Sequence, residues 1–142
     1  MWKSGGGASV TNNVIELRVP IKSEYLVILR AITGVVAGVI SLNYADIMQV
    51  RAAVSELFDL AIKHVSRTAT PSELDVRLII QPDKMEILIM GPKGYTNHLG
   101  REQGKETLAL LRSLTDEIEF GTEVAGKSLV RIVKCKSLES VT

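Results

Sequence analysis

The sequence predicts an α/β two-layer sandwich, in which helices cover one face of a mixed, mainly antiparallel sheet. Two observations support this fold class. Segments with the periodicity of strands and of helices follow one another in the order strand, helix, helix, strand, strand, helix, strand, strand. The consecutive strand pairs are joined by links short enough for hairpins, and hairpins pair their strands antiparallel.

Length and composition indicate a single folded domain. The chain has 142 residues, 46% of them hydrophobic, which is enough for one core and too few for two. The 17 Lys and Arg residues nearly balance the 16 Asp and Glu residues, so charge gives no reason to expect binding to nucleic acid or to an anionic membrane. The single cysteine, Cys135, excludes an internal disulfide and fits a cytoplasmic protein.

An apolar run at residues 26–42 raises the question of a membrane span. The run is short for a span, contains Arg30 and lacks a second cluster of anchoring charges. No small-residue cleavage motif follows it, as a secretory signal would require. We therefore expect this run to form a buried core helix.

The first half of the chain predicts one strand and two helices. Residues 14–19 alternate apolar and polar side chains, as a half-buried strand does. The first helix is expected over residues 24–40, with Ser23 as its N-cap. Asn43 is expected to cap a second helix that ends near Val65.

The second half predicts four strands and one helix. Two strand-like runs are separated by a Pro-Asp turn, which is typical of a hairpin. A glycine-containing loop precedes the helix, and a second glycine-containing turn separates the last two strands. In order, the predicted elements are strands at 74–80 and 85–90, a helix at 105–114, and strands at 117–120 and 129–135.

The predicted domain spans residues 14–136. Residues 1–13 contain a Gly-Gly-Gly run among small polar residues, a composition that we interpret as a flexible tail. Residues 137–142 are interpreted as a C-terminal tail.

The second predicted helix carries the most specific motif in the chain. From Ala53 to His64 it reads A-V-S-E-L-F-D-L-A-I-K-H. This resembles the N-box pattern A-x-S-E-x-x-x-N-A-x-x-H of the bacterial anti-sigma-factor serine kinases. Residues 20–30 are similar to that family's P-x-K-x-E-Y-x-x-x-x-R pattern, and residues 110–118 are similar to its helix that runs into a D-E-V/I strand. The resemblance covers about residues 14–135.

The resemblance implies a Bergerat fold, which is also called the histidine-kinase-like ATPase fold. In that family the domain binds ATP and Mg²⁺ and phosphorylates a serine on a small anti-anti-sigma partner of the STAS type. In its other state it holds a sigma factor and blocks transcription. Phosphoryl transfer needs a cation across the phosphates, hydrogen-bond donors around them and a carboxylate that orients the attacking hydroxyl.

By the resemblance, the second helix keeps the catalytic position and loses the metal ligand. Glu56 stands where the family places its general base, although a charged helix residue is also commonly just solvated. The family's metal-binding Asn is Leu60 here, and an alkyl side chain cannot coordinate Mg²⁺. Asp59 offers oxygen ligands one residue earlier, but it lies about 100° away around the helix.

Other family nucleotide positions also depart from the pattern. Met90 stands in place of the Asp that accepts a hydrogen bond from adenine, and a thioether is a poor acceptor. Gly94 is the one glycine kept from the D-x-G-x-G box. Gly104 is kept in the phosphate loop, with Lys105 beside it as a cation that could attract phosphate. We expect weak or no binding of ATP and Mg²⁺, and no other metal site.

Three functions remain open on the sequence. We favour a regulatory domain that binds a STAS-type anti-anti-sigma protein, a sigma factor or both, without kinase activity. Arg30 matches an arginine with which the family contacts its partners, and it equally fits a structural role. The first alternative is an active serine/threonine kinase that uses Glu56, Asp59 and Lys105, and the second is an accessory domain that binds neither ATP nor sigma factor. The apolar first helix is also compatible with a homodimer.

Overall fold

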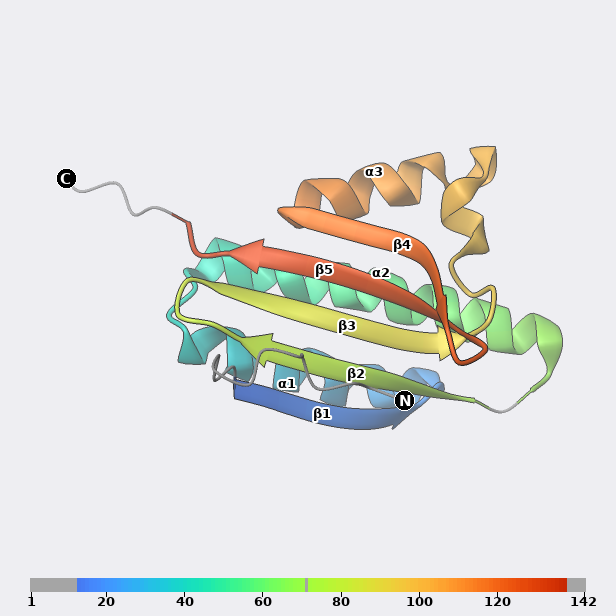
Figure 1. Cartoon of the computed structure of the whole chain (residues 1–142), viewed down its shortest axis with the longest axis horizontal. Helices are drawn as coiled ribbons and strands as arrows, with labels where there is room; N and C mark the ends of the chain where they lie inside the picture. Colours follow the sequence, from blue (N-terminus) through green and yellow to red (C-terminus); the bar gives the residue numbers. More distant parts are fainter. Residues whose placement is uncertain (1–12, 71, 138–142) are drawn as a thin grey trace.

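A five-stranded sheet forms one layer of the molecule, and helices cover one of its faces (Figure 1). The computed structural model describes residues 13–70 and 72–137, so the tails expected at residues 1–13 and 137–142 lie outside the described residues except for Asn13, which belongs to the first strand, and Ser137. In spatial order the strands are β1 (Asn13–Pro20), β2 (Glu73–Ile80), β3 (Lys84–Pro92), β5 (Lys127–Cys135) and β4 (Glu117–Val124).

All four neighbouring strand pairs of this sheet are antiparallel. The expectation of a mixed sheet is therefore wrong, while the two-layer α/β arrangement is confirmed. Strand β5 inserts between β3 and β4, so these two strands, which run in the same direction, are not neighbours. Two helices lie between β1 and β2 along the chain. The chain reverses direction before, between and after these helices, so β2 runs antiparallel to β1.

The helices are α1 (Leu26–Val39), α2 (Tyr44–Thr68) and α3 (Lys105–Leu114). In Figure 1, α1 and α2 lie behind the sheet, and α3 packs against α2 and β4. The expected cap of α2 is confirmed, because the Asn43 side chain accepts a hydrogen bond of 2.8 Å from the backbone N–H of Asp46. Among the described residues, no helix is both long enough and apolar enough to cross a membrane.

The expected Ser23 cap of α1 is wrong. The chain enters α1 through a 3₁₀ turn at Ser23–Tyr25, and no side chain caps either helix start. An N-cap residue needs an extended backbone, but Tyr25, directly before α1, already has a helical backbone (φ −92°, ψ −4°). The extended residue is Lys22, which has no side-chain oxygen.

The last two strands are longer than the sequence indicates. β4 continues through Gly121 to Val124, and only Ala125 and Gly126 form the turn, both with positive φ (52° and 78°). The pairing register shifts between Glu119 and Thr122, which marks a β-bulge. Gly121 has φ +90° within this irregular stretch, so a glycine that suggested the end of a strand belongs to the bulge instead.

The core lies between the sheet and the first two helices. The helical contribution repeats at three- and four-residue spacing, and the strand contribution alternates, as each period requires. Fully buried members include Leu29 from α1, Leu57 and Phe58 from α2, and Ile87 and Ile89 from β3.

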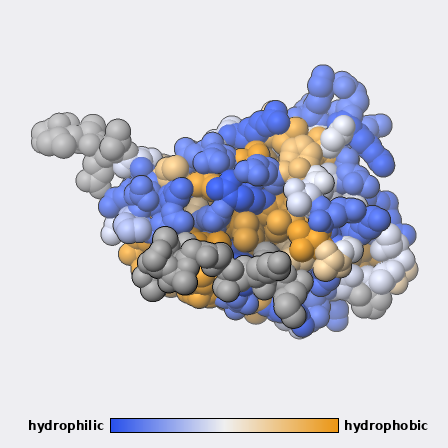
Figure 2. All heavy atoms as spheres, viewed as in Figure 1, coloured by the Kyte–Doolittle hydropathy of each residue, from blue (hydrophilic) through white to orange (hydrophobic). Residues whose placement is uncertain are grey.

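The other face of the sheet has no helix over it and carries ion pairs between strands. Arg18 and Lys127 both bind the Asp75 carboxylate, at 2.8 and 3.2 Å. Arg131 pairs with glutamates on β3 and β4. Figure 2 shows this open face, where hydrophobic residues gather along the middle between hydrophilic groups. Burial alone would raise the pKa of Asp75, but the bonds and charges of Arg18 and Lys127 hold that pKa below its ordinary value.

A buried ion pair fastens the start of α2 to the end of β5. Asp46 lies 3.7 Å from the Lys134 ammonium, and their side chains are only 5% and 8% exposed. Lys134 also donates a hydrogen bond to the Gln49 side chain. Ser137 adds two bonds to the same carboxylate, from its backbone N–H (3.2 Å) and its hydroxyl (2.9 Å). The segment that follows β5 is therefore anchored on the helix.

We predict that Asp46→Ala lowers the free energy of unfolding by about 3–5 kcal/mol, because it leaves the Lys134 charge buried without its partner. Urea denaturation measures the loss. Glu123→Ala is the matched control, since it breaks an exposed ion pair of the same 3.7 Å length with Lys93 and should cost less than about 1 kcal/mol. Adding Lys134→Met to Asp46→Ala should recover part of the loss. Equal effects of the two single variants would contradict this assignment.

Candidate functional site

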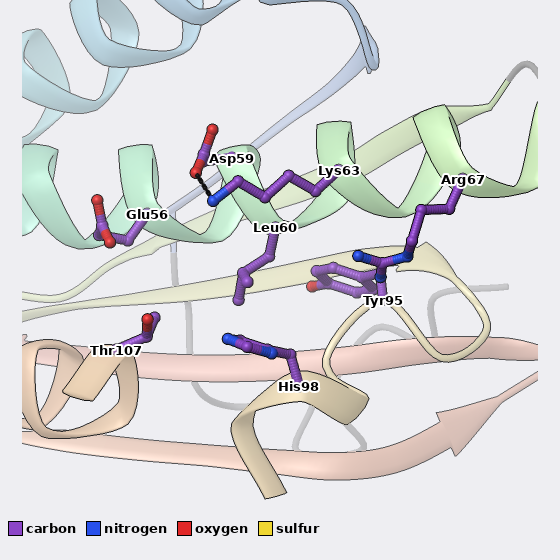
Figure 3. Close-up of a pocket in the computed structure, with 8 residues that line it drawn as sticks. All are labelled: Glu56, Asp59, Leu60, Lys63, Arg67, Tyr95, His98 and Thr107. Carbon is purple, nitrogen blue, oxygen red and sulfur yellow. Dashed lines mark ion pairs between the residues drawn. The ribbon is translucent and has the colours of Figure 1, made fainter. Parts of the chain in front are cut away.

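A small hollow lies between α2, α3 and the connecting segment at residues 93–104 (Figure 3). Its volume is about 110 Å³. Sites that bind cofactors and drug-sized ligands typically measure about 300–1,000 Å³, so this hollow has room for a few water molecules or one small ion. It is lined by Glu56, Asp59, Leu60, Lys63, Arg67, Tyr95, His98 and Thr107.

The wall that α2 provides follows from helix periodicity. Glu56, Leu60, Lys63 and Arg67 recur every three or four residues and therefore share one side of the helix. Asp59 makes an ion pair of 3.0 Å with Lys63, and both side chains are more than half exposed. Glu56 makes no ion pair with any residue of the described chain. The Asp59 carboxylate is thus already paired at the solvent-exposed side of the helix.

Leu60 fills the middle of the hollow. Its side chain extends from α2 toward Thr107 and His98 (Figure 3), and the residue is 7% exposed. The hollow is therefore apolar at its centre and polar around it. An oxygen ligand for Mg²⁺ would have to come from Glu56 or Thr107 on one side of Leu60, or from the paired Asp59.

Tyr95 closes one end of the hollow, and it was not among the site residues predicted from the sequence. The residue is 2% exposed, and its hydroxyl donates a hydrogen bond of 3.0 Å to the backbone carbonyl of Ile89. Burial raises the pKa of Tyr95 far above its usual range, so the phenol stays neutral in the folded protein. An aromatic residue four positions after Gly91, in a segment rich in glycine, was the available signal.

Met90 does not reach the hollow. In β3, Ile87, Ile89 and Gly91 face the helices, whereas Met90 lies opposite Asp75 on the open face of the sheet. Side chains alternate along a strand, and β3 continues to Pro92, so Gly91 is the residue that faces the hollow's side of the sheet. Glycine supplies no carboxylate there, and neither does Met90.

The remaining sequence-predicted residues have local structural roles. Gly94 has φ +89°, a conformation that favours glycine, and its N–H donates to the Ser128 hydroxyl at 2.9 Å. Gly104 allows a close approach, since a Cβ there would lie 1.8 Å from the His98 carbonyl oxygen. Lys105 is exposed and lies 3.4 Å from the Glu102 carboxylate, outside the hollow.

Arg30 lies on α1, far from the hollow in the fold, on a helix whose outer side is largely apolar. Its neighbours on that side are exposed aliphatic residues, and the edge strand β1 also exposes two. The exposed apolar residues of α1, β1 and the start of α2 are Val14, Ile15, Val27, Ile28, Val35, Val39, Tyr44 and Met48. Across residues 13–70 and 72–137, no three His, Cys, Asp or Glu side chains are grouped to hold a metal ion.

Several curated proteins are similar in sequence to this chain. The serine-protein kinase RsbW of Bacillus pumilus is 28% identical over 127 residues, which covers 77% of this chain and 78% of that protein. The proteins of the same name from Bacillus licheniformis and Bacillus velezensis are 32% and 30% identical over 75 and 81 residues, and these matches span only 47% and 51% of the relatives. No protein-family model matches the chain.

We predict that Gly104→Ala displaces the connecting segment and lowers the free energy of unfolding by at least about 2 kcal/mol, because the new methyl group would overlap the His98 carbonyl. Gly100→Ala is the control in the same segment, since a Cβ there meets nothing within 4 Å. Thermal unfolding and the amide NMR shifts of residues 93–104 measure the effect. Identical spectra for both variants would refute the close approach.

Proposed function

We propose that this chain, which is related in sequence to the anti-sigma-factor serine kinases, is a regulatory domain that acts by protein contact. Its proposed partners are a STAS-type anti-anti-sigma protein, a sigma factor or both. The observation that carries the proposal is the apolar outer side of α1, which the fold leaves uncovered.

The outer side of α1 has the character of a protein-binding surface. Val27, Val35 and Val39 are 67%, 71% and 69% exposed and recur at intervals of four or eight residues, so they form one stripe along the helix. Soluble proteins rarely leave such continuous apolar surface without a partner. Arg30 stands beside the stripe, and an apolar centre flanked by arginine is typical of interfaces.

The hollow supports regulation without nucleotide. Its volume is too small for a nucleoside triphosphate, and Leu60 occupies its centre. We propose that ATP and Mg²⁺ bind weakly or not at all. The alternative of an active kinase retains only Glu56 and Asp59 as acidic groups at the hollow, and Asp59 is paired with Lys63.

The same surface is compatible with a homodimer. Strand β1 is an edge of the sheet, and its Ile15, which shares the helix-covered face with Val19, is 40% exposed. A symmetric contact uses the same patch on both copies, and the apolar stripe of α1 itself carries no charge that would repel its copy. The accessory-domain alternative would leave this surface without any partner.

We predict that isothermal titration with ATP or ADP, with and without Mg²⁺, gives no binding or an affinity in the millimolar range, because the hollow is too small for a nucleotide and Leu60 offers no oxygen ligand at its centre. Dissociation constants in the micromolar range that require Mg²⁺ and are lost in Glu56→Ala or Asp59→Ala would restore the kinase alternative. Leu60→Asn is an informative companion variant, because it supplies the missing amide ligand.

We predict that Val35→Lys weakens binding to the cognate STAS protein or sigma factor at least about tenfold, because it places a charge in the centre of the apolar stripe. Purified STAS proteins and sigma factors of the same genome are the ligands, and biolayer interferometry gives the affinities. Ala109→Lys on the exposed side of α3 is the control and should bind like the wild type. Binding that neither variant changes would exclude the α1 surface.

A further inference from the structure

We propose that Gly91, Leu74 and the Ile89 carbonyl form a binding site for a planar aromatic ring. In the wild-type chain the ring of Tyr95 occupies this site. This inference deepens the proposed function and rests on it, because both assume that the hollow of the wild-type chain is closed to ligands.

The flat wall of this site is the backbone of β3. A Cβ placed on Gly91 would lie 2.9 Å from the Leu74 Cδ1 atom and 3.0 Å from both Cδ1 and Cε1 of Tyr95. Two neighbouring ring atoms at the same short distance mean that one edge of the ring lies directly against the glycine. Nine in ten real Cβ contacts are longer than this, so a larger residue at position 91 would require the ring and the end of the Leu74 side chain to shift.

The polar end of the site is one backbone acceptor. The Tyr95 hydroxyl donates to the Ile89 carbonyl at 3.0 Å within a buried environment. A buried hydrogen bond of this kind selects for a donor, since an unsatisfied polar group in the same place is costly. The site therefore suits an aromatic ring with a hydroxyl or amino donor on its edge.

Access to the site runs through the hollow. Tyr95 is one of the residues that line it, so removing the ring would join the vacated space to the existing 110 Å³. An apolar cavity of about 150 Å³ is known to accept benzene. The local turn bonds of the segment, from Tyr95 N–H to the Pro92 carbonyl and from Asn97 N–H to the Gly94 carbonyl, do not use the ring. Truncating the side chain thus leaves these backbone bonds available.

The test removes the Tyr95 ring by mutation and then adds a small aromatic molecule that can take its place. We expect Tyr95→Ala to bind phenol, seen by isothermal titration and by a rise in melting temperature, and to bind toluene about fivefold more weakly because toluene cannot donate to Ile89. The wild type and Tyr95→Phe keep the ring and should bind neither. A folded Tyr95→Ala that does not bind phenol, or equal phenol binding by the wild type, overturns the inference.

A second variant covers the case in which Tyr95→Ala does not fold. Gly91→Ala places a methyl group 3.0 Å from the ring and should displace the ring from its place against β3, so that the phenol is less well buried. Alkaline titration followed by tyrosinate absorbance should then show one further ionising tyrosine before unfolding, compared with the wild type and with Gly100→Ala. A folded Gly91→Ala with an unchanged titration overturns the inference.

The two proposals fail separately. If wild-type protein binds no nucleotide but Tyr95→Ala accepts no ring, the inference fails and the regulatory proposal stands. If the wild type binds Mg-ATP tightly, the regulatory proposal fails, and phenol binding by Tyr95→Ala alone still supports the assignment of the ring site.

Discussion

The packing of α2 across the sheet is the contact on which the other parts of the molecule depend. Leu57 and Phe58 on its inner side are fully buried against the strands, and α1 and α3 both pack against the same helix. Another side of the same turns supplies Glu56, Leu60 and the other helical residues of the hollow. Because one rigid element carries both the core and the hollow, neither can shift without the other.

Several contacts that support one another keep the hollow small. Leu60 fills its centre from the helix, and Tyr95 fills its end from the connecting segment. Gly91 allows the ring of Tyr95 to lie against the strand, and Gly104 allows the segment to fold back onto its own backbone. The result is a tightly packed region in which a bulky ligand would have to displace buried side chains.

Much of the fold could be predicted from the sequence because local patterns decide it. Asn43 caps α2 by accepting a hydrogen bond from the backbone N–H of Asp46, only three residues along the chain. The bounds of α3 match those that its apolar periodicity predicts. Features that depend on contacts between distant parts of the chain were harder to predict. The face to which Met90 points depends on which side of β3 the helices cover, and the burial of Tyr95 depends on a contact with Gly91 across a turn. Gly121 resembled the end of a strand because a bulge and a turn use the same residue type.

The two faces of the sheet are held by different physics, and solvent conditions should therefore act on them differently. Toward the helices, stability comes from apolar burial, which excluded salts such as sulfate strengthen. On the open face, ion pairs through Asp75 and Arg131 also link the strands, and simple electrolytes screen such pairs near solvent. A change in ionic strength should therefore alter the stabilising interactions on one face of the sheet more than those on the other, although the sheet is a single layer of strands.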